Sequence, residues 1–153
     1  MQPKVYLAPF YIIAATFIGI GDTLYLSYYH LLGIVPGCAI LNGCEKVLTS
    51  VYATPFGVPF AYIGLFFYAY MLGLAILLAY DPTSKGLRFG MLAYTTIGLL
   101  CSIGFELFQF FVIGALCMYC AVSAATTLVL FCLAMWHFRA TRIIEGCIKH
   151  KVL

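Results

Sequence analysis

The sequence predicts an all-α integral membrane protein: a four-transmembrane-helix bundle with an extracytoplasmic capping loop that contains a short helix. Three observations lead to this fold class. Of the 153 residues, 65% are hydrophobic and only 8% are charged, which leaves too little polar surface for a soluble domain. Four long apolar segments follow one another along the chain. Lysine and arginine are distributed unevenly between the connections that join those segments.

Each apolar segment is long enough to cross the hydrocarbon core of a bilayer, which takes about 20 helical residues. We expect the spans at about 7–29, 57–80, 87–113 and 115–138. The first segment is too apolar over too great a length for a cleaved signal peptide, so we expect a retained helix. Residues 1–153 are predicted to form a single membrane domain with an outer loop at 30–56 and a cytoplasmic tail at 139–153.

The basic residues predict the orientation, because cytoplasmic connections carry an excess of lysine and arginine. With both termini inside, only Lys46 lies outside. The other seven basic residues are then cytoplasmic: Lys4, Lys85, Arg88, Arg139, Arg142, Lys149 and Lys151. We therefore predict a multi-pass protein of the cell (inner or plasma) membrane, surrounded by lipid. The basic residues form no patch with interleaved aromatics, so nucleic-acid binding is not expected.

This orientation sorts the seven cysteines. The outer loop carries Cys38 and Cys44, and the short junction before the fourth span leads into Cys117 and Cys120. All four are expected at the extracytoplasmic face, where disulfides form and persist. The remaining three are interpreted as bystanders, two in spans and one in the tail: Cys101, Cys132 and Cys147.

Cys117 and Cys120 form a C-x-x-C motif at the start of a predicted helix. Residues at i and i+3 share a helix face, so the two thiols can bridge to one another. The unpaired N–H groups and the positive dipole end of a first helical turn favour a thiolate, the form that attacks a disulfide. The alternative is a pair of small core side chains, which are common in apolar helices.

Cys38 and Cys44 lie in a loop with Gly37 and Gly43, which provide the backbone freedom that a mobile bridge needs. Residues 42–48 are typical of a turn that enters a short amphipathic helix, which places Cys44 near a helix N-terminus. One alternative is a structural disulfide that only stabilises an exposed loop. Two pairs on one face favour instead a relay that passes electrons by disulfide exchange.

Metal chemistry competes for the same thiols. Structural zinc sites favour two closely spaced cysteine pairs, and the separation of Cys38 and Cys44 matches this poorly, with His30 as the one nearby imidazole. Covalent haem attachment needs C-x-x-C-H, and Ala121 occupies the histidine position. We predict no metal site and keep a membrane metal-ion binding or transport protein as the alternative function.

The order of these features resembles the vitamin K epoxide reductase family in its prokaryotic form, without a fused thioredoxin domain. The stretches that carry the resemblance are GDTLYLSYYHL (21–31), CAILNGCEKVLTS (38–50), FGVPFAYIGLFFY (56–68) and CMYC (117–120). The resemblance implies a four-helix bundle around a quinone, with the loop closing the pocket from outside. It also implies that Cys38 and Cys44 receive electrons from a soluble partner, and that Cys44 passes them to Cys117.

By the same resemblance, Cys120 lies nearest the quinone, Ser50 supplies a hydroxyl near the active cysteines, and Phe56 opens the second span. The quinone that the resemblance implies is ubiquinone, menaquinone or a related compound. Two positions depart from the vertebrate pattern for holding the vitamin K head group, because alanine occupies both: Ala53 and Ala124. This favours plain quinone reduction over epoxide reduction. The partner is expected to be a separate periplasmic or extracellular thioredoxin-fold protein (DsbA-like), since the chain ends soon after the fourth span.

Ionisable groups inside a membrane are costly and indicate function. Glu106 lies in the third span, two to three turns below the Cys117 end, and Asp22 lies in the outer part of the first span. Quinone reduction consumes two protons, so Glu106 is a candidate to deliver one or to hydrogen-bond the ring. The alternative for each carboxyl is a protonated group bonded within the bundle.

We therefore interpret the chain as a quinone-linked, disulfide-generating thiol oxidoreductase of the vitamin K epoxide reductase type. The other quinone-linked disulfide oxidases (the DsbB type) fit less well, because they carry the C-x-x-C in the first outer loop and the second pair in a longer second outer loop. A structural membrane subunit with stapled loops is a further alternative. It predicts no catalytic consequence of Cys120→Ala.

Overall fold

The computed structural model describes residues 3–38, 43–54 and 57–151, and the packing of side chains between residues 7 and 143. The chain is helical almost throughout these ranges, and no strand occurs in them. The elements in chain order are α1 (Pro3–Leu31), α2 (Cys44–Leu48), the 3₁₀ turn η1 (Val51–Ala53), α3 (Phe60–Tyr80), α4 (Lys85–Phe108), the π-helical turn η3 (Gln109–Ile113) and α5 (Met118–Lys151).

Four of the described helical stretches are long and apolar enough to cross a membrane: Leu7–Leu31, Phe60–Tyr80, Lys85–Ile113 and Met118–Ile143. The predicted four-helix membrane bundle is therefore confirmed. The second span begins at Phe60, three residues later than expected, because Gly57 adopts a positive φ and Pro59 is the extended residue that precedes the helix. The fourth begins at Met118, since left-handed Gly114 ends η3 and a non-helical segment, 115–117, follows.

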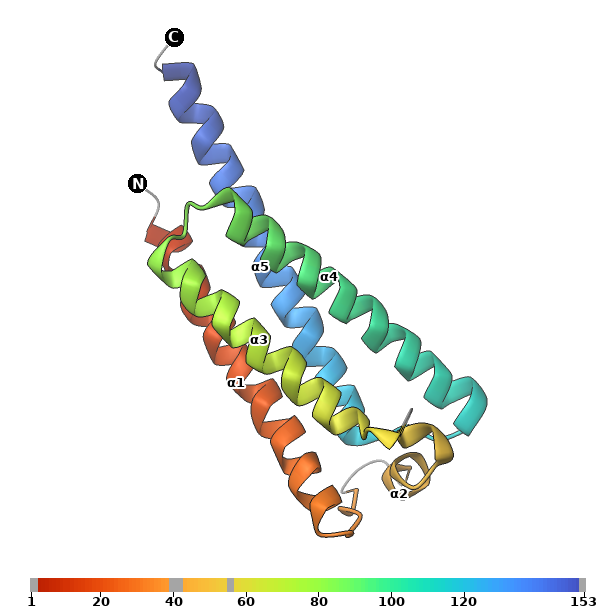
Figure 1. Cartoon of the computed structure of the whole chain (residues 1–153). Helices are drawn as coiled ribbons and strands as arrows, with labels where there is room; N and C mark the ends of the chain where they lie inside the picture. Colours follow the sequence, from red (N-terminus) through yellow and green to blue (C-terminus); the bar gives the residue numbers. More distant parts are fainter. Residues whose placement is uncertain (1–2, 39–42, 55–56, 152–153) are drawn as a thin grey trace.

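The long helices pack as a bundle, with α1 against α3 and α5, and α4 against α5 (Figure 1). Small residues bring the helices close together, as is usual between membrane helices. A methyl group on Gly19 of α1 would overlap the Tyr68 ring of α3. The Tyr68 hydroxyl is in turn hydrogen-bonded to Ser123 and Thr127 of α5, at 2.9 and 3.1 Å, so one side chain joins three helices.

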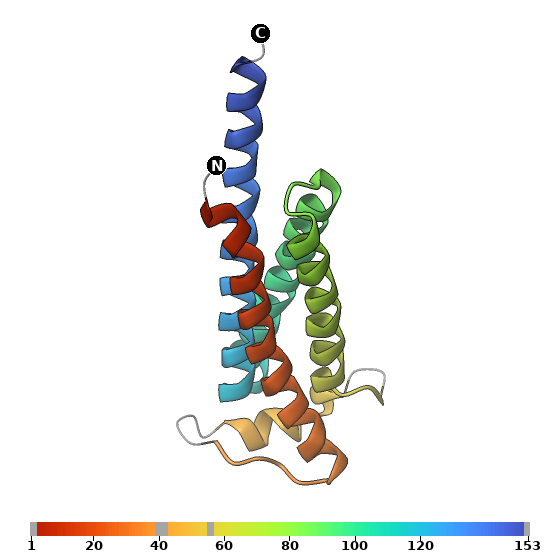
Figure 2. The same cartoon turned by 90° about the vertical axis from the view of Figure 1, so that its left-hand side faces the viewer.

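Both termini lie at one end of the bundle, and α2 lies across the opposite end (Figures 1 and 2). The predicted capping loop with a short helix is thus present. The capping loop packs tightly against the connection between α4 and α5, because a methyl group on Gly43 would overlap the backbone oxygen and nitrogen of Leu116. Helix α5 continues past the apolar stretch that ends at Ile143 as far as Lys151, so most of the expected tail is helical.

Candidate active site

Two of the predicted cysteines form a disulfide in the capping loop. We call the described residues of this loop, 32–38 and 43–54, the cap. Cys38 and Cys44 are bonded to one another, with their Cα atoms 5.7 Å apart. Cys44 is the first residue of α2, and only 1% of its surface is exposed. Val47, one turn further along α2, is also buried and packs with Cys44 and Cys117. The cap therefore turns Cys44 toward the bundle.

Cys117 lies directly beneath this disulfide, in the connection between the third and fourth spans. Its side chain is fully buried, and its Sγ lies 3.7 Å from the Sγ of Cys44. Its carbonyl accepts the Ala121 N–H at 3.0 Å, which makes Cys117 the N-cap residue directly before α5. Cys120 therefore lies in the first turn of that helix, whereas Cys117, which was expected inside the same helix, directly precedes it.

The environment of Cys117 favours its thiolate. A hydrogen bond from the Cys120 thiol is the largest cause that lowers the pKa of Cys117, from 9.0 to about 7. The backbone N–H groups of Cys120 and Tyr119 lower this pKa further, whereas burial opposes them. These N–H groups belong to the first turn of α5, where helical N–H groups have no carbonyl partner within the helix. Cys117 is thus a thiol with an unusually low pKa.

Tyr119 joins the C-x-x-C motif to the cap. Its hydroxyl donates a hydrogen bond of 3.1 Å to the carbonyl of Gly37, the residue before Cys38. Its ring also lies 5.5 Å from the Tyr25 ring of α1. The side chain between the two motif cysteines therefore holds the loop segment that leads into the Cys38–Cys44 disulfide.

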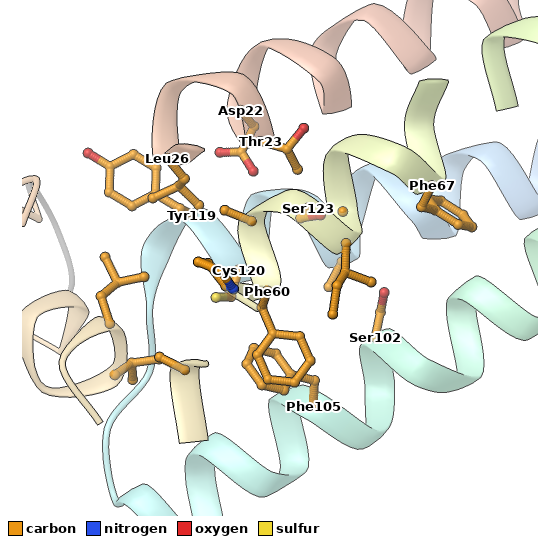
Figure 3. A pocket seen from close by; sticks show the side chains of 18 of the residues that line it. Asp22, Thr23, Leu26, Phe60, Phe67, Ser102, Phe105, Tyr119, Cys120 and Ser123 are labelled. Atoms are coloured by element: carbon orange, nitrogen blue, oxygen red, sulfur yellow. The ribbon is translucent and has the colours of Figure 1, made fainter. Parts of the chain in front are cut away.

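A cavity of about 580 Å³ lies among the four long helices below the cap. Its wall includes Cys120, and two carboxyl side chains face it from opposite helices, Asp22 from α1 and Glu106 from α4. Figure 3 shows Cys120 between Asp22 on one side and the aromatic pair of Phe60 and Phe105 on the other. The rings of that pair are 4.3 Å apart.

These residues fit a quinone. The volume lies within the range of roughly 300 to 1,000 Å³ that small-molecule sites occupy. Phe60 and Phe105, whose rings are tilted against one another, offer an aromatic surface to a flat ring. Asp22 Oδ2 and Glu106 Oε1 are buried and have no hydrogen-bond partner among the described residues, so each is available to a ligand with polar ring oxygens.

Only some of the residues that the sequence predicted to contact the quinone line the cavity. Glu106 lines the cavity, as do the two alanines at the vertebrate head-group positions, Ala53 and Ala124. Ser50 is absent from the cavity wall, and its hydroxyl donates to the Val47 carbonyl at 2.7 Å. Phe56 lies outside the described residues.

Of the three cysteines interpreted as bystanders, Cys101 is exposed yet contributes to the cavity wall from α4. Cys132 is exposed and does not line the cavity. The side chain of Cys147 lies outside the described part of the chain. Among the described residues, no three His, Cys, Asp or Glu side chains are grouped closely enough to hold a metal ion.

Sequence reasoning gave no role to Gln109, the first residue of η3. It is fully buried, and its Oε1 accepts the Cys117 N–H at 3.0 Å. The signal that could have found it is an uncharged polar side chain within an apolar aromatic run, eight residues before the motif cysteine. Phe60 was also missed, because its role depends on the approach of α3 to α4.

A loop disulfide, a C-x-x-C pair and a cavity follow one another at one end of this bundle, an arrangement suited to thiol–disulfide chemistry in a membrane protein. The profile of the Vitamin K epoxide reductase family matches residues 10–135, and the chain belongs to this family. The chain is also similar to the thiol-disulfide oxidoreductase LTO1 of Arabidopsis thaliana, with 34% identity over 121 residues. That alignment covers 74% of this chain and 32% of the plant protein, so the chain spans about a third of that relative's length.

Proposed function

We propose that this protein is a quinone-dependent thiol oxidoreductase that generates disulfides. Electrons pass from an extracytoplasmic (periplasmic or extracellular) thioredoxin-fold protein to Cys38 and Cys44, then to Cys117 and Cys120, and finally to a membrane quinone. The observation that carries the proposal is the 3.7 Å approach of the Cys117 sulfur to Cys44, with Cys120 on the cavity side of the same motif. Family membership and the name of the plant relative support thiol–disulfide chemistry.

The transfer between the pairs takes two exchange steps. Once the partner has reduced the loop disulfide, the Cys44 thiolate attacks the Cys117 sulfur of a Cys117–Cys120 disulfide, and Cys120 leaves as a thiolate. The Cys38 thiolate then attacks Cys44 and releases Cys117. The loop is oxidised again, and both electrons reside on Cys117 and Cys120, which is the redox state that the described structure represents. The low pKa of Cys117 makes it a good leaving group in the second step.

The cavity residues bind and orient the acceptor beside Cys120. A bound quinone supplies the two-electron acceptor chemistry that side chains lack. Phe60 and Phe105 hold a flat ring, while Asp22 and Glu106 hold or deliver protons at the ring edge. The apolar bundle around the cavity excludes water from the thiols. Ubiquinone, menaquinone and related quinones all present this flat ring with polar oxygens.

The proposed orientation places the cysteine end on the extracytoplasmic side of the cell membrane and both termini in the cytoplasm. Support comes from the basic residues, because Lys85 and Arg88 lie in the first turn of α4 and Arg139 and Arg142 in the distal part of α5, at the end opposite α2. Outside, the exposed face of the cap is available to a separate thioredoxin-fold (DsbA-like) protein. Thiol exchange there requires direct contact with the Cys38–Cys44 bond.

The test is quinone reduction by the purified protein, with either a reduced thioredoxin-fold protein or dithiothreitol as the donor. Wild type is compared with each of the four cysteines changed to alanine. We expect Cys117→Ala and Cys120→Ala to abolish turnover with both donors. Cys38→Ala and Cys44→Ala should fail with the protein donor and still accept dithiothreitol. A wild-type protein that reduces no quinone and purifies with bound metal would contradict the proposal in favour of the metal-binding alternative.

A further inference from the structure

Gln109 is a buried polar side chain that the relay described above does not use. It begins η3, and five-residue π-helical turns of this kind occur often at functional sites. Its side chain has no exposed surface. Because a buried amide that lacks a partner costs free energy, each of its two polar atoms requires an explanation.

The carboxamide oxygen is accounted for. Gln109 Oε1 accepts the backbone N–H of Cys117 at 3.0 Å. The Gln109 carbonyl also accepts the Ala115 N–H at 3.3 Å, so the residue holds the segment before α5 at two points. Since the Cys117 N–H can only donate, the amide orientation is fixed and Nε2 must point to the other side.

The carboxamide nitrogen has no partner among the described residues, although it is buried. The Gln109 side chain lies against the thiol of Cys120. A neutral thiol is a weak acceptor, whereas a thiolate accepts strong charge-assisted hydrogen bonds. The free N–H₂ group therefore faces a sulfur that becomes negatively charged at one stage of the exchange.

We propose that Gln109 is a positioning residue for Cys117 and the hydrogen-bond donor to the Cys120 thiolate. This inference rests on the proposed function. When the Cys44 thiolate attacks Cys117, the Cys44–Cys117 bond forms, the Cys117–Cys120 bond breaks, and the electron pair of the broken bond remains on Cys120. Gln109 Nε2 then donates to that sulfur while Oε1 keeps Cys117 in line with Cys44. A single carboxamide thus holds the backbone of Cys117, whose sulfur is attacked, and donates a hydrogen bond to the departing sulfur of Cys120.

The experiment isolates Cys120 from the relay. In a Cys117→Ala background, the backbone N–H that anchors Oε1 remains and the neighbouring thiol is gone. Site-resolved mass spectrometry follows alkylation of Cys120 by iodoacetamide across pH, in detergent and without quinone. Gln109 is compared with Gln109→Glu, which keeps the acceptor but lacks the donor when ionised, and with Gln109→Met, which lacks both. Ser102→Ala, a change of a polar cavity-lining residue in the same membrane span, is the control.

We expect both Gln109 variants to slow Cys120 alkylation at neutral pH by about ten- to a hundredfold, the usual effect of a hydrogen bond to a charged group. In a plot of the Cys120 alkylation rate against pH, the inflection should move to higher pH. The plateau at high pH should be unchanged, because it reports only the access of iodoacetamide to the thiolate. Asp22 and Glu106, which share the cavity with Cys120, are the same in every variant, as are the charged residues of α2, Glu45 and Lys46.

Inflections that coincide in Gln109, Gln109→Glu and Gln109→Met would overturn the inference, whatever the variants do to turnover. A changed plateau with an unchanged inflection would also overturn it, since that result describes a purely structural residue. The assay contains no quinone and no partner, so a failure of the proposed function in the turnover assay is a separate result from a failure here.

Discussion

The sulfur of Cys117 lies 3.7 Å from the sulfur of Cys44, which is itself bonded to Cys38. Cys117 belongs to the start of α5 and Cys44 to the start of α2, so two helix N-termini meet at one pair of sulfur atoms. Both residues are almost completely buried. The contact is the point at which the cap and the bundle can exchange a disulfide.

The first prediction concerns the mixed disulfide. In a Cys38→Ser variant, Cys44 has no resolving partner and its nearest sulfur is that of Cys117. Mild oxidation should therefore give a Cys44–Cys117 crosslink, measured by mass spectrometry of the digested protein. The matched variant Cys44→Ser should give little Cys38–Cys117 crosslink, because Cys44 is the loop cysteine at the contact. Equal yields from the two variants would contradict the proposed order of the exchange.

The second prediction concerns pH. The pKa of Cys117 is lowered to about 7, so its thiolate predominates above that pH and is lost by protonation below it. Alkylation of Cys117 in the protein with reduced C-x-x-C should rise with pH around this value. In Cys120→Ala, the largest cause of the lowered pKa is removed, and the inflection should move toward the ordinary value of 9.0. An unchanged inflection in Cys120→Ala would assign the lowered pKa to the backbone N–H groups alone.

The third prediction concerns the packing of the cap against the Leu116 backbone at Gly43. Gly43→Ala forces a methyl group against the Leu116 backbone, so α2 must move away from Cys117. We expect a loss of most of the Cys44–Cys117 crosslink in the Cys38→Ser background and slower turnover with a protein donor. Gly37→Ala in the same loop is the matched control, since a methyl group there meets no atom within 4 Å. A normal crosslink yield in Gly43→Ala would show that the cap has more freedom than this contact implies.

The fourth prediction concerns Glu106. Glu106→Gln keeps the size of the side chain and removes its proton-transfer capacity. Turnover of quinone with dithiothreitol should fall by about a hundredfold or more if the carboxyl delivers a proton, the usual scale of general acid catalysis. Glu45→Gln, an exposed change on α2, is the control. If the Glu106→Gln rate matches wild type across pH, Glu106 has no part in the reaction.

The fold was largely predictable because a bilayer imposes simple length and composition limits on each span. The starts of the second and fourth spans differed from expectation for local reasons. Gly57 and Pro59 delay α3, and left-handed Gly114 leads into a non-helical segment before α5. These are backbone conformations at single residues, and hydropathy carries no information about them.

The cysteines of the candidate site could be found from the sequence, because spacing and topology placed two pairs on one face. Ser50 could not be placed in the same way. Its hydroxyl is occupied by the Val47 carbonyl at the end of α2, a local hydrogen bond that competes with any role in the cavity. Gln109 and Phe60 depend on which helices approach one another, and that is set by tertiary packing at small residues such as Gly98, whose added methyl group would overlap the Phe67 ring.

The most direct test of the relay is the order in which its cysteines are oxidised in a single turnover. Fully reduced protein is mixed anaerobically with one equivalent of quinone, quenched with acid, alkylated and mapped by mass spectrometry. The account predicts that the Cys117–Cys120 disulfide appears first, together with quinol, and that the Cys38–Cys44 disulfide appears later at its expense. In Cys44→Ala only the first disulfide should form. Oxidation of Cys38 and Cys44 before Cys117 and Cys120, or no quinol at all, would contradict the account.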